Sequence, residues 1–327
     1  MSDVKYCLAI GVCKEAVHAI KKAQEKGYCV IALDGDDNAA GLSVADIGIC
    51  VDIRDIAKVI EVIKAYKIEF ILPVPIGRWL LMTGMVNEKL GLPGVKEKSI
   101  ENCIDKYKFH KILCENSLRN NKLICLNTKN DVETVDFFPC IIKPRFGSGS
   151  NDVQEVKSRE KLSEIVCGLD FRKEFLIEEK FIGEEYGVDG AIIDGNVKVV
   201  LLRKKINTNP PYCQCVGYLE IPQYEEKLYR NVSKYIGKII ESLKLNNTLF
   251  HADIIVNDEE ISIIEMAPRP SGHNLHDVFT PICTGVDMVE EYINFVEGNK
   301  YKFDALNHKE QYLMHFWNFS DFLLLRP

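Results

Sequence analysis

The 327-residue chain is predicted to begin with a Rossmann-like α/β domain built on a parallel sheet and to continue as an α+β fold. Over roughly the first hundred residues, short apolar runs alternate with amphipathic segments of helical period, which is typical of a parallel sheet covered by helices. Farther along, apolar runs follow one another across short glycine-containing turns, as in antiparallel sheets. The length is sufficient for two or three domains.

The alternation in the first part is regular enough to place each element. Val17, Ile20 and Ala23 recur at helical spacing, and Gly27 follows as the kind of residue that ends a helix. The pattern predicts strands at 7–10, 29–33, 47–51 and 70–72 and helices at 15–26, 55–66 and 76–90.

Composition excludes several classes of protein. The net charge of −7 is spread along the chain without a basic stripe, which argues against nucleic acid as a partner. No apolar run reaches the roughly 18 residues of a membrane span, so no membrane association is expected. The start lacks a signal-peptide pattern and most of the 12 cysteines lie in apolar runs, which together predict a cytoplasmic protein with reduced thiols. Cys213 and Cys215 have no second pair nearby, so plain strand residues are favoured over a zinc site.

A parallel sheet raises the hypothesis of dinucleotide binding. Asp34, at the end of the second predicted strand, stands where a ribose-binding acid would be expected. However, no glycine follows Gly11 until Gly27, so the phosphate-binding glycine pattern is missing and NAD binding is disfavoured. The first domain is instead expected to be a scaffold whose strand ends line a substrate pocket.

The segment 141–151 reads as a strand followed by a glycine- and serine-rich loop, and 153–156 as a second strand. A lysine within the aliphatic strand would be costly without a negative partner, and glycines let backbone N–H groups approach an anion closely. The pattern therefore suggests a binding site for nucleotide phosphates. The alternative is a mobile hairpin turn with a solvated lysine. The residues concerned are Lys143, Gly147, Ser148, Gly149 and Ser150.

Lys106 lies in the first turn of a helix predicted at 106–114, which Asp105 can cap. The helix dipole disfavours a cation at that end. Lys106 is therefore either simply solvated or a second contact to an anion.

Four glutamates surround a glycine at 183, between strands predicted at 175–182 and 185–193. Adenine requires backbone donors and acceptors at a strand edge, and ribose requires a carboxylate, so these residues fit a nucleoside. The alternative is a charged hairpin end that faces water. The four are Glu178, Glu179, Glu184 and Glu185.

Asp253 and Glu265 fall on adjacent strands that are expected to pair in antiparallel fashion and to be largely buried. Facing carboxylates repel unless a cation lies between them, and Mg²⁺ is the oxygen-seeking ion that accompanies nucleotides. Arg269 follows directly, and its planar guanidinium suits a phosphate or a carboxylate.

Two segments, 203–215 and 271–277, are expected to be loops that contact the substrates, because binding residues are often on loops. Their sequences do not identify the substrates. His273, His276 and Asp277 form a motif that could bind a metal, but a loop gives no fixed geometry and a substrate or structural role is favoured.

The order of these motifs resembles that of the ATP-grasp superfamily, of the carboxylate–amine ligase type. It is similar in layout to biotin carboxylase, carbamoyl phosphate synthetase and the purine-pathway ligases. The resemblance implies a pre-ATP-grasp domain at 1–95, a two-subdomain ATP-grasp fold at 96–300 and a short tail at 301–327 that forms at most a hairpin or a strand. It also implies ATP and Mg²⁺ as cofactors.

The resemblance assigns a role to each motif. Lys106 and Lys143 match phosphate-binding lysines, and the residues from Gly147 to Ser150 match a mobile lid. Asp253 and Glu265 match Mg²⁺ ligands, and Arg269 the arginine that meets the transferred phosphate. The adenine and ribose contacts match Glu179, Lys180, Ile182 and Glu185.

The activity implied is an ATP-dependent ligase that activates a carboxylate as an acyl phosphate and joins it to an amine. One departure is Ala267, where the family usually has an asparagine, which leaves a second Mg²⁺ site in question. The rivals are a bicarbonate-activating, carbamoyl-phosphate-type enzyme and a nucleotide-binding regulatory protein. Partners are expected to be a small-molecule carboxylate and amine, with a homodimer as the default assembly.

Overall fold

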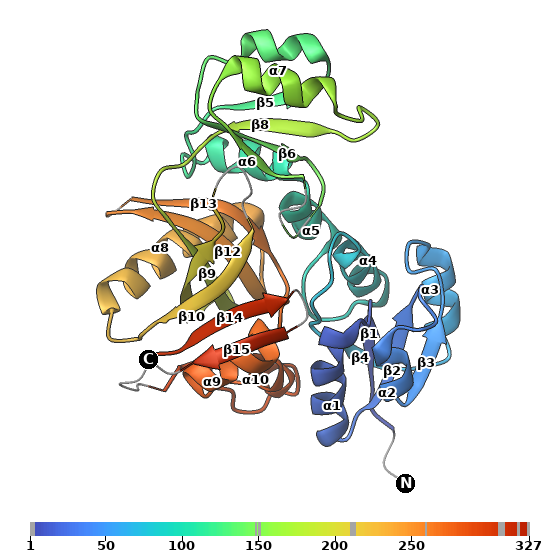
Figure 1. The fold of residues 1–327 in the computed structure, drawn as a ribbon. Coiled ribbons are helices and arrows are strands. Elements are labelled where there is room, and N and C mark those ends of the chain that lie inside the picture. Colours follow the sequence, from blue (N-terminus) through green and yellow to red (C-terminus); the bar gives the residue numbers. More distant parts are fainter. Residues whose placement is uncertain are drawn as a thin grey trace.

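The computed structural model describes residues 4–147, 149, 152–209, 214–258, 260–306, 311–318 and 321–325. Three sheets organise this part of the chain, and each forms a separate body in Figure 1. A four-stranded sheet lies in the N-terminal unit, a second four-stranded sheet lies at the top of the view, and a seven-stranded sheet lies below it. We call them the parallel, small and large sheets.

The parallel sheet contains β1 (Tyr6–Ile10), β2 (Cys29–Asp34), β3 (Ile47–Cys50) and β4 (Ile68–Ile71) in the order β3-β2-β1-β4. Every pairing in it is parallel, so the predicted Rossmann-like domain is confirmed. Its helices are α1 (Val17–Glu25), α2 (Ala40–Val44), α3 (Ile56–Ile63) and α4 (Leu80–Leu90).

In this unit the predicted start of one helix was wrong, and one short helix was not predicted. The helix expected at 76–90 begins only at Leu80, because Ile76 is buried in the preceding loop and packs over Gly11, where a Cβ atom would lie 2.2 Å from Ile76 Cδ1. The short helix α2 had no amphipathic pattern long enough to reveal it. Asp34 has a structural contact in this unit, since its Oδ2 accepts a hydrogen bond from Val12 N of the loop after β1 at 2.7 Å.

The small sheet has the order β5-β8-β6-β7 and antiparallel pairings. Its strands are β5 (Leu123–Leu126), β6 (Cys140–Pro144), β7 (Gln154–Val156) and β8 (Phe175–Glu179), and α7 (Arg159–Cys167) packs on it. The helices α5 (Glu97–Ile104) and α6 (Lys106–Glu115) precede these strands and bury their apolar residues in the main core of the molecule. Asp105 caps α6 as predicted, with Oδ1 accepting from Tyr107 N at 3.1 Å. Strand β8 ends at Glu179, three residues earlier than predicted, and 180–183 connect the small sheet to the large one.

The large sheet is antiparallel and has the order β13-β12-β9-β10-β11-β14-β15. Its strands are β9 (Glu184–Ile193), β10 (Asn196–Asn207), β11 (Cys215–Ile221), β12 (Thr248–Asn257), β13 (Glu260–Ala267), β14 (Leu313–Asn318) and β15 (Asp321–Leu325). The helices of this unit are α8 (Glu226–Leu243), a π-helical turn (Leu275–Phe279), α9 (Thr280–Thr284) and α10 (Met288–Val296). The last two strands form the hairpin that was one expectation for the C-terminal tail.

Strand register places polar side chains on one face of the large sheet. Gly187 of β9 pairs with both Arg203 and Asp253, and Asp189 pairs with His251. Because side chains alternate between faces, these residues share a face with Glu185 and Glu265. The opposite face carries the apolar residues that meet α8, which buries Val232, Ile236 and Ile239.

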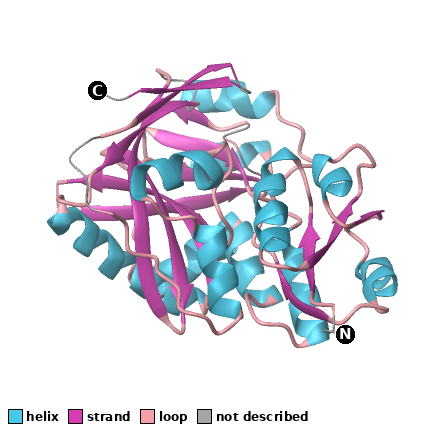
Figure 2. Cartoon of the chain, turned by 90° about the horizontal axis from the view of Figure 1, so that it is seen from below, coloured by secondary structure: helices cyan, strands magenta, loops and turns pink. Residues whose placement is uncertain are grey.

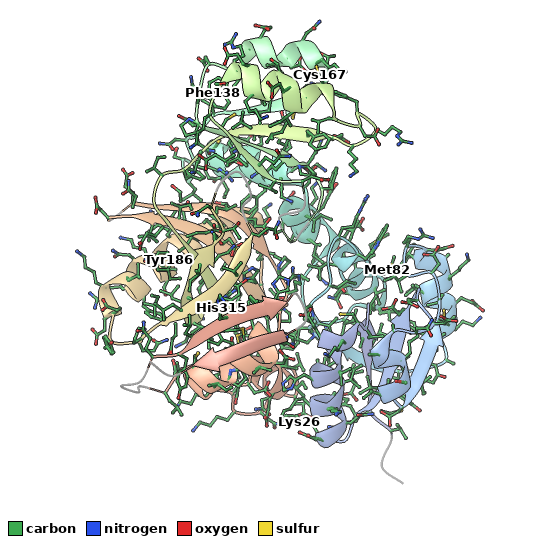
Figure 3. The ribbon with its side chains drawn as sticks, in the orientation of Figure 1. Lys26, Met82, Phe138, Cys167, Tyr186 and His315 are labelled. Carbon is green, nitrogen blue, oxygen red and sulfur yellow. The ribbon has the colours of Figure 1, made fainter. Side chains whose placement is uncertain are left out.

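The N-terminal unit is attached to the rest of the chain through α1 and α10. Viewed from below, helices lie between the parallel sheet and the long strands of the large sheet (Figure 2). His18 Nε2 lies 2.9 Å from Asp287 Oδ2, and Lys26, near the foot of α1 in Figure 3, donates to Asn294 Oδ1 at 2.8 Å. This hydrogen bond with Asp287 raises the pKa of His18 above its ordinary value.

The stability of this contact should depend on pH with a definite sign. Because the folded pKa of His18 is raised, its contribution is complete below the unfolded pKa of about 6.5 and is lost as pH rises through the folded pKa. We expect His18→Gln to lower the free energy of unfolding near pH 6, by about 1.4 kcal/mol for each unit by which the pKa is raised. Urea unfolding of both proteins between pH 5 and pH 9 measures the difference, and a difference that does not shrink at high pH would contradict the prediction.

Candidate active site

A cavity of about 320 Å³ lies between the small and large sheets. One wall is the connection 179–182, and the other is formed by Ile255 and Ser262 on the polar face of the large sheet. Residues 180–182 follow β8 and precede β9, and the backbone N–H of Lys180 donates to Pro139 O at 3.2 Å. Ile182 is 64% exposed at the rim. The cavity thus has a largely polar lining with three apolar side chains, namely Phe181, Ile182 and Ile255.

Lys143 enters the space between the sheets from β6, and it is buried. Its ammonium forms an ion pair with Glu178, which also pairs with the buried Arg119. Burial, together with Arg119 and Lys106, holds the pKa of Lys143 well below its ordinary value. Two cations therefore share a single carboxylate here, and an incoming anion would be stabilised.

Arg119 is a site residue that the sequence did not reveal. It lies outside every motif, four residues after the end of the helix α6, and its burial lowers its pKa to about 10. Its Nε donates to Asn121 Oδ1 at 2.7 Å, and its Nη1 donates to Ile264 O at 3.4 Å. Arg119 therefore joins the small sheet to β13 of the large sheet.

Lys106 lies beside the glycine loop. Its Nζ donates to Gly147 O at 2.7 Å and lies 3.9 Å from Glu265 Oε2. Gly147 and Gly149 have φ angles of +144° and +70°, which strain any other residue. The other two residues predicted for this loop, Ser148 and Ser150, lie outside the described residues. Lys106, Lys143 and the loop therefore come together at one end of the cleft.

Asp253 and Glu265 are register partners on β12 and β13, as the sequence predicted. The positive charges beside these two acids are lysine side chains, Lys205 at Asp253 and Lys106 at Glu265. Lys205 Nζ lies 2.9 Å from Asp253 Oδ2 and also pairs with Glu185, to which Asn207 Nδ2 donates at 2.6 Å. Burial alone would lower the pKa of Lys205, but the nearby carboxylates of Asp253 and Glu185 hold this pKa well above its ordinary value.

Arg269 follows β13, and its Nη1 donates to Pro270 O at 2.6 Å. Burial lowers its pKa, while Glu265, Glu15 and Asp189 oppose this change. Beside it, Arg203 and Asp189 form a fully buried ion pair, and Arg203 Nη2 lies 3.1 Å from His251 Nδ1. The expectation of a substrate loop at 203–215 was partly wrong, because 203–207 belong to β10.

Two of the predicted nucleoside contacts have other partners in this structure. Lys180 Nζ donates to Glu155 Oε2 of β7 at 2.6 Å, and Glu179 Oε2 accepts from Lys122 N at 3.0 Å. Both Lys180 and Glu179 nevertheless line the cavity. In the histidine motif, His276 is fully buried and its Nδ1 lies 3.8 Å from Asp277 Oδ1. Within the described ranges, no group of three histidine, cysteine or acidic residues could hold a metal by itself.

The two sheets face each other across the cavity, and Lys106 and Lys143 lie close together beside Glu265. In the comparison with known protein families, residues 136–277 match the ATP-grasp domain family. The predicted ATP-grasp resemblance is therefore confirmed over this domain.

Similar proteins extend the comparison over most of the chain. A formate-dependent phosphoribosylglycinamide formyltransferase of Sulfurovum sp. (strain NBC37-1) is 22% identical over 266 residues, which are 76% of this chain and 66% of that protein. The L-amino acid ligase of Bacillus licheniformis has a TM-score of 0.81 at 20% identity, over 96% of this chain and 80% of that one. An N5-carboxyaminoimidazole ribonucleotide synthetase in complex with ADP has a TM-score of 0.78 at 17% identity, over 96% and 83%. The predicted fold, a Rossmann-like domain followed by an ATP-grasp fold, is thus confirmed.

The shared carboxylate of Glu178 should be a major source of stability. Glu178→Gln leaves Lys143 and Arg119 buried without a negative partner, and we expect the free energy of unfolding to fall by about 3 kcal/mol. Denaturant unfolding measures the change. Glu164→Gln is the control, because the Glu164 side chain is 67% exposed and pairs only with Lys161 among the described ion pairs. Equal effects of the two substitutions would show that the buried pairing is unimportant.

Proposed function

We propose that the protein is an ATP-dependent ligase that activates a carboxylate as an acyl phosphate and joins it to an amine. The observation that carries this proposal is the convergence, at one end of a cleft between two sheets, of Lys106, Lys143, Gly147 and the facing acids Asp253 and Glu265. The ATP-grasp domain and the fold shared with a ligase and an ADP-bound synthetase support it.

The nucleotide follows the length of the cleft in this proposal. Adenine occupies the 320 Å³ cavity against the backbone of 179–182, between Ile182 and Ile255. Glu179 and Lys180 position this segment, and Glu185 accepts from the ribose hydroxyls. The phosphates meet Lys106, Lys143 and the backbone of the loop that contains Gly147, Ser148, Gly149 and Ser150.

The donor set suits Mg²⁺ bound together with a nucleotide. Asp253 and Glu265 supply two oxygen donors from paired strands, and Mg²⁺ commonly uses one or two carboxylates and fills its remaining positions with phosphate oxygens and water. Bound there, the ion would neutralise phosphate charge during transfer.

In the first half-reaction, a carboxylate oxygen of the substrate forms a bond to the γ-phosphorus, and the bond to the β–γ bridging oxygen breaks with release of ADP. Lys106 and Lys143 hold the phosphates in line, which is the main requirement of phosphoryl transfer. Arg269 stabilises the charge that develops on the transferred group. In the second half-reaction, an amine attacks the acyl carbon and phosphate leaves, while the glycine loop excludes water.

We propose that the first domain ends at residue 95 and that the ATP-grasp subdomains occupy 96–300. The final segment contributes β14 and β15 to the large sheet. None of the described helices is long and apolar enough to cross a membrane. We further propose a cytoplasmic enzyme whose partners are small-molecule acids and amines, with a homodimer as the default assembly.

The test is phosphate release from Mg·ATP in the presence of pooled carboxylic acids and amines. Release that requires both an acid and an amine supports the ligase, whereas release with bicarbonate alone favours the carbamoyl-phosphate-type enzyme. Tight binding of ATP without turnover in any mixture favours a regulatory protein. If the protein does not bind ATP, the proposed roles of Lys106 and Lys143 as phosphate contacts and of Glu265 as a Mg²⁺ ligand are wrong.

Arg269 should separate chemistry from binding. We expect Arg269→Met to lower kcat by roughly 10²–10³-fold, because it removes a charge aimed at the transferred group, while ATP affinity changes little. Turnover and ATP titration calorimetry measure the two effects. Arg230→Met is the matched control, since Arg230 is 76% exposed on α8. Loss of ATP binding equal to the loss of kcat would place Arg269 in ground-state binding instead.

A further inference from the structure

Lys205 occupies the centre of the polar face of the large sheet. It follows Lys204, whose register partner is Tyr186, so it lies beside Glu185 of β9. Its side chain crosses β9 and reaches Asp253 on β12, with Nζ 2.9 Å from Oδ2. The side chain is only 10% exposed, and it pairs with Glu185 as well. The strand register thus fixes a cation between two acids of the proposed nucleotide site.

This position matters for the number of metal ions. Asp253 and Glu265 are the two acids proposed to hold a divalent ion, and one oxygen of Asp253 is already paired with Lys205. One divalent ion can use the other oxygen of Asp253 together with Glu265, but a second ion would have to bind Oδ2, next to the Lys205 ammonium group in a largely buried site. Like charges at that separation repel strongly where water is mostly excluded.

The neighbouring strand provides no further ligand for a second ion. Ala267 is two residues beyond Glu265 on β13, on the same face, and its methyl group cannot coordinate a metal. Its register partner is His251, whose Nδ1 faces the Asp189–Arg203 ion pair and whose Nε2 lies 3.6 Å from Asp253 Oδ1. Among the described residues, Glu185 is the other carboxylate that shares Lys205 with Asp253, and it is also engaged by Asn207.

We propose that Lys205 takes the place of a second divalent ion, so that the nucleotide binds with a single Mg²⁺ between Asp253 and Glu265. Lys205 is then a positioning residue that holds Asp253 in one orientation and contributes fixed positive charge. The inference rests on the proposed function, because it assumes that the cleft binds a nucleotide.

Counting bound ions tests the proposal without measuring activity. Mn²⁺ replaces Mg²⁺, and adenylyl imidodiphosphate serves as the non-hydrolysable nucleotide. Electron paramagnetic resonance of free Mn²⁺ gives the number of ions bound per nucleotide. We expect one ion for the wild-type protein and two for Lys205→Met, which frees Asp253 and Glu185 as ligands. Lys205→Arg keeps the charge and should bind one.

The matched control is Lys198→Met on the same strand, since the Lys198 side chain is 52% exposed and pairs with Asp304 far from the cleft. It should bind one ion. Two ions in the wild-type protein would overturn the inference even if the Lys205 variants failed to fold. A count of one in a folded Lys205→Met protein would also overturn it. If the analogue does not bind to the wild-type protein at all, the proposed function fails instead.

Discussion

The pairing of Glu178 with both Lys143 and Arg119 is the interaction on which the arrangement of the cleft depends. Glu178 lies on β8 of the small sheet, whereas Arg119 also donates to the backbone of Ile264 in the large sheet. One buried carboxylate thereby connects the two walls of the cleft. Since an isolated buried charge costs several kcal/mol, the three groups hold one another in place. The excess positive charge that remains is directed toward the space where phosphates are proposed to bind.

The parts of the fold set by local pattern were predictable from the sequence. Alternating strands and helices gave the parallel sheet, and Asp105 gave the start of α6. The pairing of Asp253 with Glu265 followed from two apolar runs joined by a short turn. Arg119 could not be found in this way, because its partners are distant in sequence and it belongs to no periodic segment. Nor could Lys205, since reaching Asp253 requires the order of three strands, which no single segment specifies.

The site residues differ in how far the structure brings them together. Lys106 contacts both Gly147 and Glu265, and Lys143 lies near Lys106 and Glu265. Lys180 and Glu179 instead bind Glu155 and the backbone of Lys122. This division follows from backbone geometry. The acids at 253 and 265 are fixed by strand register, but the segment 180–182 lies between two sheets and contributes mainly backbone groups. The amino-acid type therefore predicts the role of a residue less well at 179–182 than at the strand positions.

The lysines of the cleft also explain how its acids are tolerated before any ligand arrives. Asp253 and Glu265 face each other across a strand pair, an arrangement that is unfavourable for two anions alone. Lys205 neutralises the first, and Lys106 lies near the second while it also holds Gly147 O. A nucleotide and its metal ion would enter a site whose charges are already balanced in pairs. In the proposed function, binding exchanges these partners: phosphate competes with Glu265 for Lys106, and the metal ion takes Glu265. Because Lys106 also donates to Gly147 O, the proposed exchange would break that hydrogen bond as well.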